Sequence, residues 1–334
     1  MRKKILAPMN WDPKVLESGA DEYYASVRGG IVGTAREDDR LPEVGPSRIR
    51  EITSKAKVWY ALNASCLGSL QEMEKQKDRY IRHLRIIEDL GFYGVIIAHP
   101  YLIPLVQEHT NLKIDISTIL EVDSVQKIRY FHDMGVDVIT LHQSVHRNFD
   151  LLDRLKEFPE DFVFIANTAC IFCCPFRISH YNIQSHSLEK CLTSDYPYNL
   201  CRAITVKDYP LNVLKANWVR PQDLYLYDEY ENLHIKISGR TMPTWWILRA
   251  VKAYRDRKYD GNLFDLAPMV RGTLRKTEGE KELYIDCRSL NGFLREIKEK
   301  RPNCYTDCGK NCTICYRWAK MLRETGKAYR VKEE

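Results

Sequence analysis

Eleven cysteines are the residues of this sequence with the clearest capacity for chemistry. Thiolates at short spacing are typical ligands of zinc or of iron–sulfur clusters. A first set begins at Cys170 and continues through Cys173 and Cys174, with Cys191 and Cys201 further along the chain. We predict that Cys170, Cys174, Cys191 and Cys201 bind metal. Cys174 is favoured over its neighbour Cys173, which we expect to pack inward.

A second set lies near the C-terminus, where Cys304, Cys308, Cys312 and Cys315 follow the spacing C-x3-C-x3-C-x2-C. Four thiolates within twelve residues form a complete local ligand set. Such a set suits a tetrahedral zinc site and a 4Fe–4S cluster equally. We therefore predict a second metal site and leave its metal open between zinc and iron.

A third group consists of polar side chains at the ends of predicted strands or within the first cysteine segment. Its members are Asn63, His99, His142, Arg147, Asn167, Arg177 and Arg240. Histidines in such places can shuttle protons, and the arginine fork matches carboxylate and phosphate groups. We predict that the group forms a pocket for an anionic ligand. No single residue is singled out as catalytic.

The elements that must position these residues follow a repeated phrase. A helix ends on glycine, two or three residues follow, and a β-branched or aromatic strand begins, as at Gly91 before Val95 and at Gly135 before Val138. A glycine just past a helix adopts the left-handed conformation that closes the last turn. Repetition of this unit is typical of an α/β protein.

Eight segments read as strands, and seven of them are separated by stretches that can be helical. The predicted strands are Lys4–Ala7, Glu22–Val27, Lys57–Asn63, Gly94–Ala98, Lys113–Thr118, Val136–His142, Asp161–Asn167 and His234–Ser238. Helical spacing predicts a helix over Gln71–Leu90, and Asp123 with Gln126 resembles a capping box that opens another. Eight such units predict a (β/α)8 TIM-like barrel, with a doubly wound sheet as the alternative.

Two regions do not fit a plain barrel. A long insertion, residues 170–231, follows strand seven and carries the first cysteine set, so we assign residues 1–265 to the barrel with its insertion. Residues 266–334 form a cysteine-rich C-terminal extension. The net charge of +6 comes from this end, because residues 270–334 hold 16 Lys and Arg against 10 Asp and Glu. A basic end can contact phosphates, although a solvated helix surface has the same composition.

The sequence has no secretory segment and no run long enough to span a membrane, so we expect a cytoplasmic protein. Thiols stay reduced in that compartment, which favours metal over disulfides. Cys66 and Cys287 stand alone and are expected to be unliganded. The sequence lacks Gly-x-Ser-x-Gly, His-Glu-x-x-His, a Walker loop and Gly-x-Gly-x-x-Gly, which weakens protease, NTPase and nicotinamide interpretations.

Several phrases in order resemble the collagenase-like peptidases, peptidase family thirty-two of unassigned catalytic type. They are Leu6-Ala-Pro8, Gly19-Ala-Asp-Glu-Tyr-Tyr24, the strand-seven exit into Cys170, Asn217-Trp-Val-Arg220-Pro-Gln-Asp223, Lys236-Ile-Ser-Gly239-Arg240, Ala253-Tyr-Arg255 and Tyr259-Asp-Gly-Asn262. The resemblance covers roughly residues 5–265. It departs at Asn167-Thr-Ala169, where many members read His-Gly-Ala, and in an early second cysteine.

The resemblance implies a barrel with a 4Fe–4S cluster on four cysteines. By position, Cys170 resembles the first cluster cysteine, and Arg147 and Arg240 fall where the family places basic residues. Several relatives are oxygen-independent hydroxylases that act on tRNA or ribosomal RNA bases or on a quinone precursor. Some of them draw the oxygen from a small anionic donor.

Three hypotheses follow. The first is an iron–sulfur enzyme that hydroxylates, or otherwise modifies, an RNA base or an aromatic small molecule without O2. It would use one 4Fe–4S cluster, or two with the C-terminal set, and would act alone, as a homodimer or as a heterodimer. The second is a zinc-stabilised RNA-binding or scaffold partner of another enzyme. The third is a peptidase of the collagenase-like family.

Overall fold

The computed structural model describes residues 3–34, 41–186, 195–268 and 283–330. Eight parallel strands form a closed barrel in the order of the sequence. The strands are β1 (Ile5–Pro8), β2 (Glu22–Ala25), β3 (Val58–Leu62), β4 (Gly94–Ile97), β5 (Lys113–Ile116), β6 (Val138–Thr140), β7 (Asp161–Ile165) and β8 (Leu233–Lys236). The predicted (β/α)8 barrel is confirmed, and the doubly wound alternative is wrong because β1 pairs with β8, with Ile5 opposite Ile235. All eight predicted strands are present, with bounds that agree to within about two residues.

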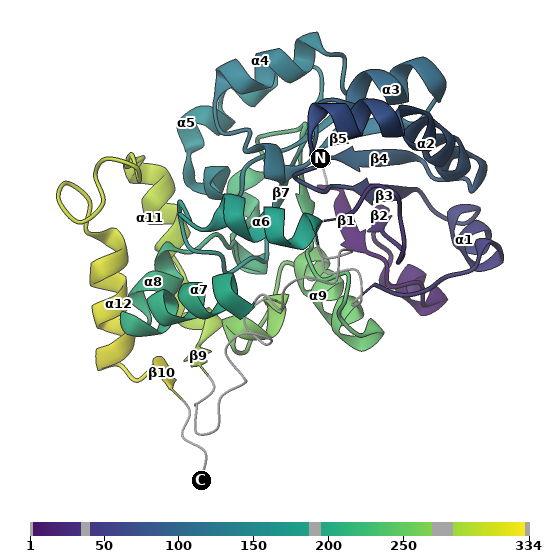
Figure 1. Cartoon of the computed structure of the whole chain (residues 1–334). Helices are drawn as coiled ribbons and strands as arrows, with labels where there is room; N and C mark the ends of the chain where they lie inside the picture. Colours follow the sequence, from purple (N-terminus) through teal and green to yellow (C-terminus); the bar gives the residue numbers. More distant parts are fainter. Residues whose placement is uncertain (1–2, 35–40, 187–194, 269–282, 331–334) are drawn as a thin grey trace.

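Helices surround the barrel and fill the regions between strands (Figure 1). They are α1 (Pro46–Thr53), α2 (Leu70–Asp89), α3 (Leu102–His109), α4 (Val125–Asp133), α5 (Phe149–Leu152), α6 (Arg177–Ser185), α7 (Asp195–Lys207), α8 (Leu211–Lys215), α9 (Thr244–Asp256), α11 (Phe293–Lys300) and α12 (Ile314–Glu324). The insertion supplies α6, α7 and α8. The extension supplies α11, α12 and an antiparallel pair of short strands, β9 (Leu283–Ile285) and β10 (Ala328–Arg330). No helix among these described elements is long and apolar enough to cross a membrane.

The helix predicted over Gln71–Leu90 is α2, which Ser69 and Glu72 open with a capping box. The capping box predicted for Asp123 and Gln126 is wrong. Ser124 is the N-cap of α4, because its short side chain reaches the Lys127 N–H at 3.3 Å. Asp123 instead forms an ion pair with Lys127 at 2.9 Å.

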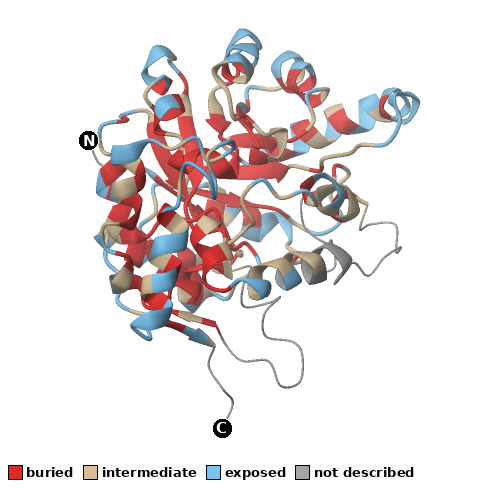
Figure 2. Cartoon of the chain, turned by 90° about the vertical axis from the view of Figure 1, so that its left-hand side faces the viewer, coloured by how far each residue is buried: buried red, intermediate tan, exposed pale blue. Residues whose placement is uncertain are grey.

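Side chains inside and outside the barrel form separate apolar clusters. Leu6, Tyr24, Trp59 and Ile96 pack together inside, because alternate residues of a strand face opposite sides. The larger cluster lies between the strands and the helices and appears as the buried layer in Figure 2. It also includes apolar residues of the extension, such as Phe293 and Leu322. The extension therefore shares the apolar core of the barrel.

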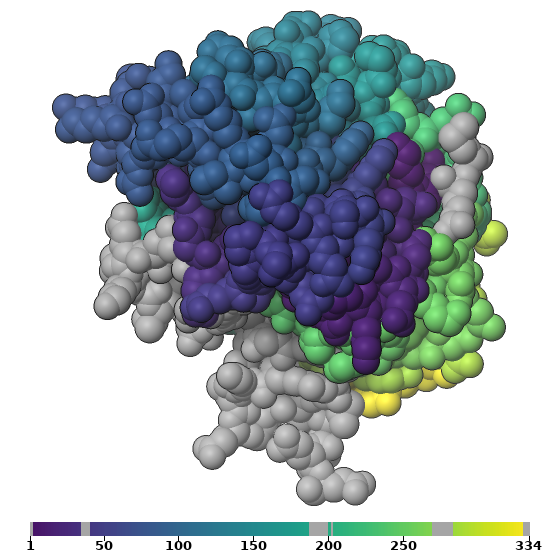
Figure 3. All heavy atoms as spheres, turned by 90° about the vertical axis from the view of Figure 1, so that its right-hand side faces the viewer, coloured from purple at the N-terminus to yellow at the C-terminus, as the bar shows by residue number. Residues whose placement is uncertain are grey.

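Two segments that lie far apart in the sequence cover the seam between β1 and β8. Helix α9 contacts both β1 and the short 3-10 helix η1 (Pro13–Ser18). In the space-filling view, the N-terminal segment in purple accordingly adjoins the green segment that contains α9 (Figure 3). Barrel closure thus brings residues far apart in the sequence into one face.

Gly94, the first residue of β4, provides a stability prediction. A Cβ at this position would lie 2.5 Å from the Lys113 carbonyl oxygen and 2.6 Å from the Trp59 ring, and neither can move freely. We expect Gly94→Ala to lower the free energy of unfolding by about 1–3 kcal/mol. Urea titration measures the change, with Gly45→Ala as control because no atom lies within 4 Å of that Cβ. Equal stability of the two variants would contradict the prediction.

Candidate functional site

The first cysteine set lies where the chain leaves β7 and enters the insertion. The Cys170 carbonyl accepts a hydrogen bond from the Asn217 N–H at 3.1 Å, which fixes the start of this segment. The Cys201 thiol, on α7, donates a hydrogen bond to Cys174. This hydrogen bond and burial raise the pKa of Cys201, and the charges of Cys174 and Cys170 act in the same direction. The structure therefore brings Cys170, Cys174 and Cys201 together, and Cys191 lies outside the described residues.

Cys174 and Cys173 differ in their surroundings. The hydrogen bond from Cys201 lowers the pKa of Cys174 to about 6, and the Phe176 N–H and the Arg177 charge act in the same direction. Cys173 is exposed and adopts a left-handed backbone conformation, with φ of 51°. The expectation that Cys173 packs inward is wrong, because this conformation turns the residue toward solvent.

Arg177 is the first residue of α6 and lies beside these cysteines. Its side chain is buried, with 6% of the residue exposed, and its Nη1 lies 3.7 Å from Glu121 Oε1. Neither Nη1 nor Nη2 has a hydrogen-bond partner among the residues that the structure describes. A buried guanidinium with unused donors costs stability unless a ligand completes its bonding. Arg177 therefore has the surroundings of an anion-binding residue.

His142 stands next to the same carboxylate. Its Nε2 lies 4.0 Å from Glu121 Oε1, and its Nδ1 accepts a hydrogen bond from the Ser144 N–H at 3.4 Å. Burial and the neighbouring Arg177 lower the pKa of His142 to about 3. The imidazole is therefore neutral near pH 7. Glu121, which the sequence analysis missed, has a left-handed backbone with φ of 53°, a feature without a sequence signal in a glutamate.

Arg147 is buried in a different place. It donates to His146 Nε2 at 3.1 Å and to the Ala216 carbonyl at 3.0 Å. Its guanidinium also lies 5.6 Å from the Trp218 ring and 5.3 Å from the Phe293 ring, so it faces α11 of the extension. Arg147 and Arg177, which were predicted to line one pocket, therefore have different neighbours.

The other predicted pocket residues are held by the barrel rim. Both Asn167 Nδ2 hydrogens are used by the Ser238 and Leu266 carbonyls, and Asn167 Oδ1 accepts from the Ser238 N–H and hydroxyl. This amide joins the ends of β7 and β8 and has no bond left for a substrate. Arg240 donates to the Ser26 hydroxyl at 2.9 Å and lies 5.7 Å from the Tyr24 ring.

Asn63 and His99 follow β3 and β4 at the same end of the barrel, and both are half-buried. His99 Nδ1 accepts a hydrogen bond from the Tyr101 N–H at 3.3 Å, and burial lowers its pKa. Its ring is therefore oriented by the start of the following segment. Neither residue is placed in contact with Arg177 by the described interactions.

The second cysteine set forms a compact turn before α12. Asp307 O accepts a hydrogen bond from the Cys312 N–H at 2.8 Å, and the Cys312 carbonyl accepts from Gly309 at 2.9 Å. Burial and the charges of the other three cysteines raise the pKa of Cys304 to about 11, against the effect of Arg147. All four sulfurs of the set therefore lie within electrostatic reach of one another.

The two cysteine sets are neighbours. The Phe172 ring, between Cys170 and Cys173, lies 5.2 Å from the Tyr305 ring, next to Cys304. Burial, together with the charges of Cys173 and Cys304, raises the pKa of Tyr305 to about 12. The sequence did not reveal this proximity, because more than a hundred residues separate the sets.

The thiols match an iron–sulfur cluster in donor type, and Cys191 belongs to the same insertion as the other three. Within residues 3–34, 41–186, 195–268 and 283–330, no group of three or more His, Cys, Asp or Glu side chains is gathered as tightly as a bound metal ion requires. The residues therefore fit the group in donor type, whereas the described geometry does not gather three of the thiols at metal-binding distance.

A buried ion pair inside the barrel also escaped the sequence analysis. Lys236 Nζ lies 3.6 Å from Asp115 Oδ2, and the Thr140 hydroxyl donates to Asp115 at 2.8 Å. Burial raises the pKa of Asp115 and lowers that of Lys236. The alternation Lys113-Ile-Asp115-Ile was the available signal, because alternate strand residues face the barrel interior.

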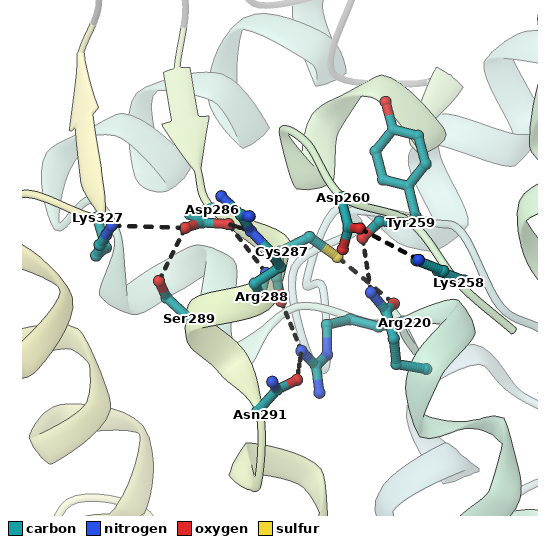
Figure 4. A network of polar contacts seen from close by, with 11 residues as sticks. Arg220, Lys258, Tyr259, Asp260, Asp286, Cys287, Arg288, Ser289, Asn291 and Lys327 are labelled. Carbon is teal, nitrogen blue, oxygen red and sulfur yellow. Dashed lines mark hydrogen bonds and ion pairs between the residues drawn. The ribbon is translucent and has the colours of Figure 1, made fainter.

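Residues of the phrase Arg220-Pro-Gln-Asp223 have a structural role, and Figure 4 shows Arg220 beside Cys287 and Asn291. Arg220 is fully buried and forms a bidentate ion pair with Asp223 at 2.6 and 2.7 Å. It also donates to the Cys287 carbonyl and, at 3.0 Å, to Asn291. Asn262 similarly bonds Leu283 and Ile285 of the extension. These residues attach the extension to the barrel. Cys287 is buried, as expected of an unliganded residue.

Comparison with known proteins gives consistent matches. The family model described as peptidase family U32 matches residues 14–260. An uncharacterized protease of Methanocaldococcus jannaschii is 32% identical over 274 residues, which cover 81% of this chain and 76% of that protein. The solved structure of a U32 peptidase aligns with a TM-score of 0.50 and 18% identity, over 72% of this chain and 93% of that one, and supports the fold.

Proposed function

The chain belongs to peptidase family U32, and from this premise we propose that it is an iron–sulfur enzyme that modifies an RNA base or an aromatic small molecule without O2. In this proposal Cys170, Cys174, Cys191 and Cys201 hold a 4Fe–4S cluster. The observation that supports the proposal is the hydrogen bond of the Cys201 thiol to Cys174 beside the buried Arg177, whose Nη1 and Nη2 have no hydrogen-bond partner among the described residues. Barrel enzymes place their active sites at this carboxyl end of the strands.

When bound, such a cluster would supply redox chemistry. The chain's own residues bind and orient. The unused Nη1 and Nη2 donors of Arg177 would bind a carboxylate of a small anionic oxygen donor. The Nδ1 of His142 accepts from Ser144, so the neutral imidazole carries its hydrogen on Nε2 and can donate a hydrogen bond to the ligand.

Iron analysis after anaerobic purification and reconstitution tests the cluster. We expect about four irons and four sulfides per chain, or about eight if the C-terminal set also binds a cluster. Cys174→Ser should abolish the signal of the first cluster, whereas the matched variant Cys66→Ser should keep it. Fewer than about three irons per chain in the wild type would rule out the cluster.

The substrate class is tested separately. Modified nucleosides of tRNA and rRNA, and aromatic metabolites, are compared by mass spectrometry between cells with and without the gene. A single missing hydroxylated product would identify the substrate as RNA or metabolite. Unchanged pools in both classes, with the cluster present, would overturn the modification activity and leave the cluster assignment standing.

Two other functions have specific support. The family name, and the relative described as an uncharacterized protease, favour a peptidase. Cleavage of protein substrates by the purified chain, unaffected by Cys174→Ser, would support it over the iron–sulfur enzyme.

The four thiols of the C-terminal set favour a zinc-stabilised RNA-binding partner. Zinc without iron, and RNA affinity that falls steeply with salt, would support that function.

A further inference from the structure

A cavity opens at the amino end of the barrel, on the opposite side from both cysteine sets. Its volume is about 210 Å³, and the first residues of the strands line it. Its floor consists of interior side chains, including Trp59, Val163 and the buried Asp115. Polar groups at this end of a TIM barrel usually stabilise the fold. The charged residues at the starts of the strands form a ring around this cavity, and their arrangement calls for a more specific explanation.

Charges around the ring are separated by sign. In strand order, one arc carries Lys4, Lys57 and Lys113, with Glu22 between the first two. The following arc carries Asp137 and Asp161. The cavity therefore has a basic side and an acidic side across its opening. Such a field orients a dipolar ligand and attracts neither a simple anion nor a simple cation over the whole ring.

Most of these groups have partners. Lys4 pairs with Asp161 at 2.6 Å, and Lys113 pairs with Asp137 at 2.6 Å. The Trp59 Nε1–H donates to Glu22 at 2.6 Å. These bonds hold the ring in place without a ligand, so the cavity is preformed.

Two groups are incompletely matched. Lys57 has no carboxylate partner among the described side chains, and its Nζ lies over the Tyr93 ring at 4.6 Å. His234 is buried, with 8% exposed, and its Nδ1 has no hydrogen-bond partner in the described part of the chain. Its Nε2 forms an ion pair with Asp161 Oδ1 at 3.4 Å, and this contact lowers the pKa of Asp161 to about 2. A buried imidazole nitrogen without a partner in the wall of a polar cavity indicates a missing ligand or water.

We propose that this cavity binds a small zwitterion of amino-acid size. Its carboxylate would lie toward Lys57 on the basic arc, and its ammonium group toward Asp161 and His234 on the acidic arc. The volume admits a molecule of this size. This site is independent of the cysteine sets, and its occupant does not enter the proposed reaction.

Saturation-transfer NMR on the full-length protein, with an equimolar mixture of the twenty standard amino acids, tests the proposal. At least one amino acid should give a saturable signal with a Kd near or below about 1 mM. Lys57→Gln should raise that Kd at least about tenfold. Lys55→Gln is the matched control, because Lys55 is exposed, pairs with Glu51 and lies outside the cavity.

A second variant checks the location. Val163 lines the cavity, so Val163→Phe should fill it and remove the signal. If that variant does not fold, Lys57→Gln at the exposed rim decides alone. The proposal is overturned if no amino acid binds to the wild type, or if Lys57→Gln binds as the wild type does. Iron content serves as an independent readout, and neither variant should change it.

Discussion

Lowering the pH from 7 to 5 is expected to reduce the free energy of unfolding by about 4 kcal/mol through His142 and His146 alone, at about 2 kcal/mol each. The folded-state pKa of each is about 3, because of burial and of neighbouring arginines. An unfolded histidine titrates near pH 6.5. Between these values the unfolded chain binds more protons. The stabilisation is therefore complete above about pH 6.5 and is lost as the pH falls.

The bonds of His146 explain why it cannot accept a proton in the folded chain. Its Nδ1 lies 2.9 Å from the Gln143 carbonyl oxygen, so it donates there, and its Nε2 accepts from Arg147. Urea titrations at pH 5, 6 and 7 measure how steeply the free energy of unfolding depends on pH. His146→Gln should reduce this slope by the amount that corresponds to about one bound proton. His132→Gln should make the slope steeper. Glu160 raises the pKa of His132, so this pair favours folding as the pH falls and opposes the effect of His142 and His146. A slope unchanged in His146→Gln would contradict the assignment.

Asp223→Ala is expected to destabilise the protein by about 3–5 kcal/mol, because it leaves the Arg220 guanidinium buried without its charge partner. Arg220 is 1% exposed and Asp223 is 3% exposed. Thermal and urea unfolding would report the loss. The extension should also become sensitive to limited proteolysis, since Arg220 binds the Cys287 carbonyl and Asn291.

Asp260→Ala provides the control for that variant. Asp260 belongs to the same region in Figure 4 but is partly exposed and lies 3.9 Å from Lys258. Its removal should change the free energy of unfolding by less than about 1 kcal/mol. The double variant Arg220→Met with Asp223→Leu should recover most of the lost stability, because it leaves no buried charge. An equal loss of free energy of unfolding in Asp223→Ala and Asp260→Ala would refute this account.

The barrel could be predicted from the sequence because its signals are local. Gly91 and Gly135 end helices, and apolar runs follow at regular intervals. The arrangement of the site could be predicted only in part. Cys170, Cys174 and Cys201 lie near one another, but no group of three is gathered tightly enough to hold a metal among the described residues, so their role as ligands stays a prediction. Arg147 and Arg177 were assigned to one pocket, yet they have different neighbours, because position in the sequence does not determine the direction of a long side chain.

Two features had no sequence signal. The contact between Phe172 and Tyr305 joins segments brought together only by tertiary packing. Arg220 and Asn262 belong to the phrases that carry the family resemblance, and in the structure they attach the extension. A polar residue in a loop can serve either packing or chemistry, and the identity of its partners distinguishes the two.

The shared apolar core has a consequence for synthesis on the ribosome. Ile5 pairs with Ile235, and the same core extends to Ala328. Domains usually fold as they emerge, N-terminal parts first, at about 5–20 residues per second. Here one edge of β1 must wait for β8, more than 200 residues later in the sequence, so the nascent barrel carries an unpaired edge until β8 emerges. Dependence on chaperones during expression should reflect this delay, and it should increase when the extension that completes the apolar core is shortened.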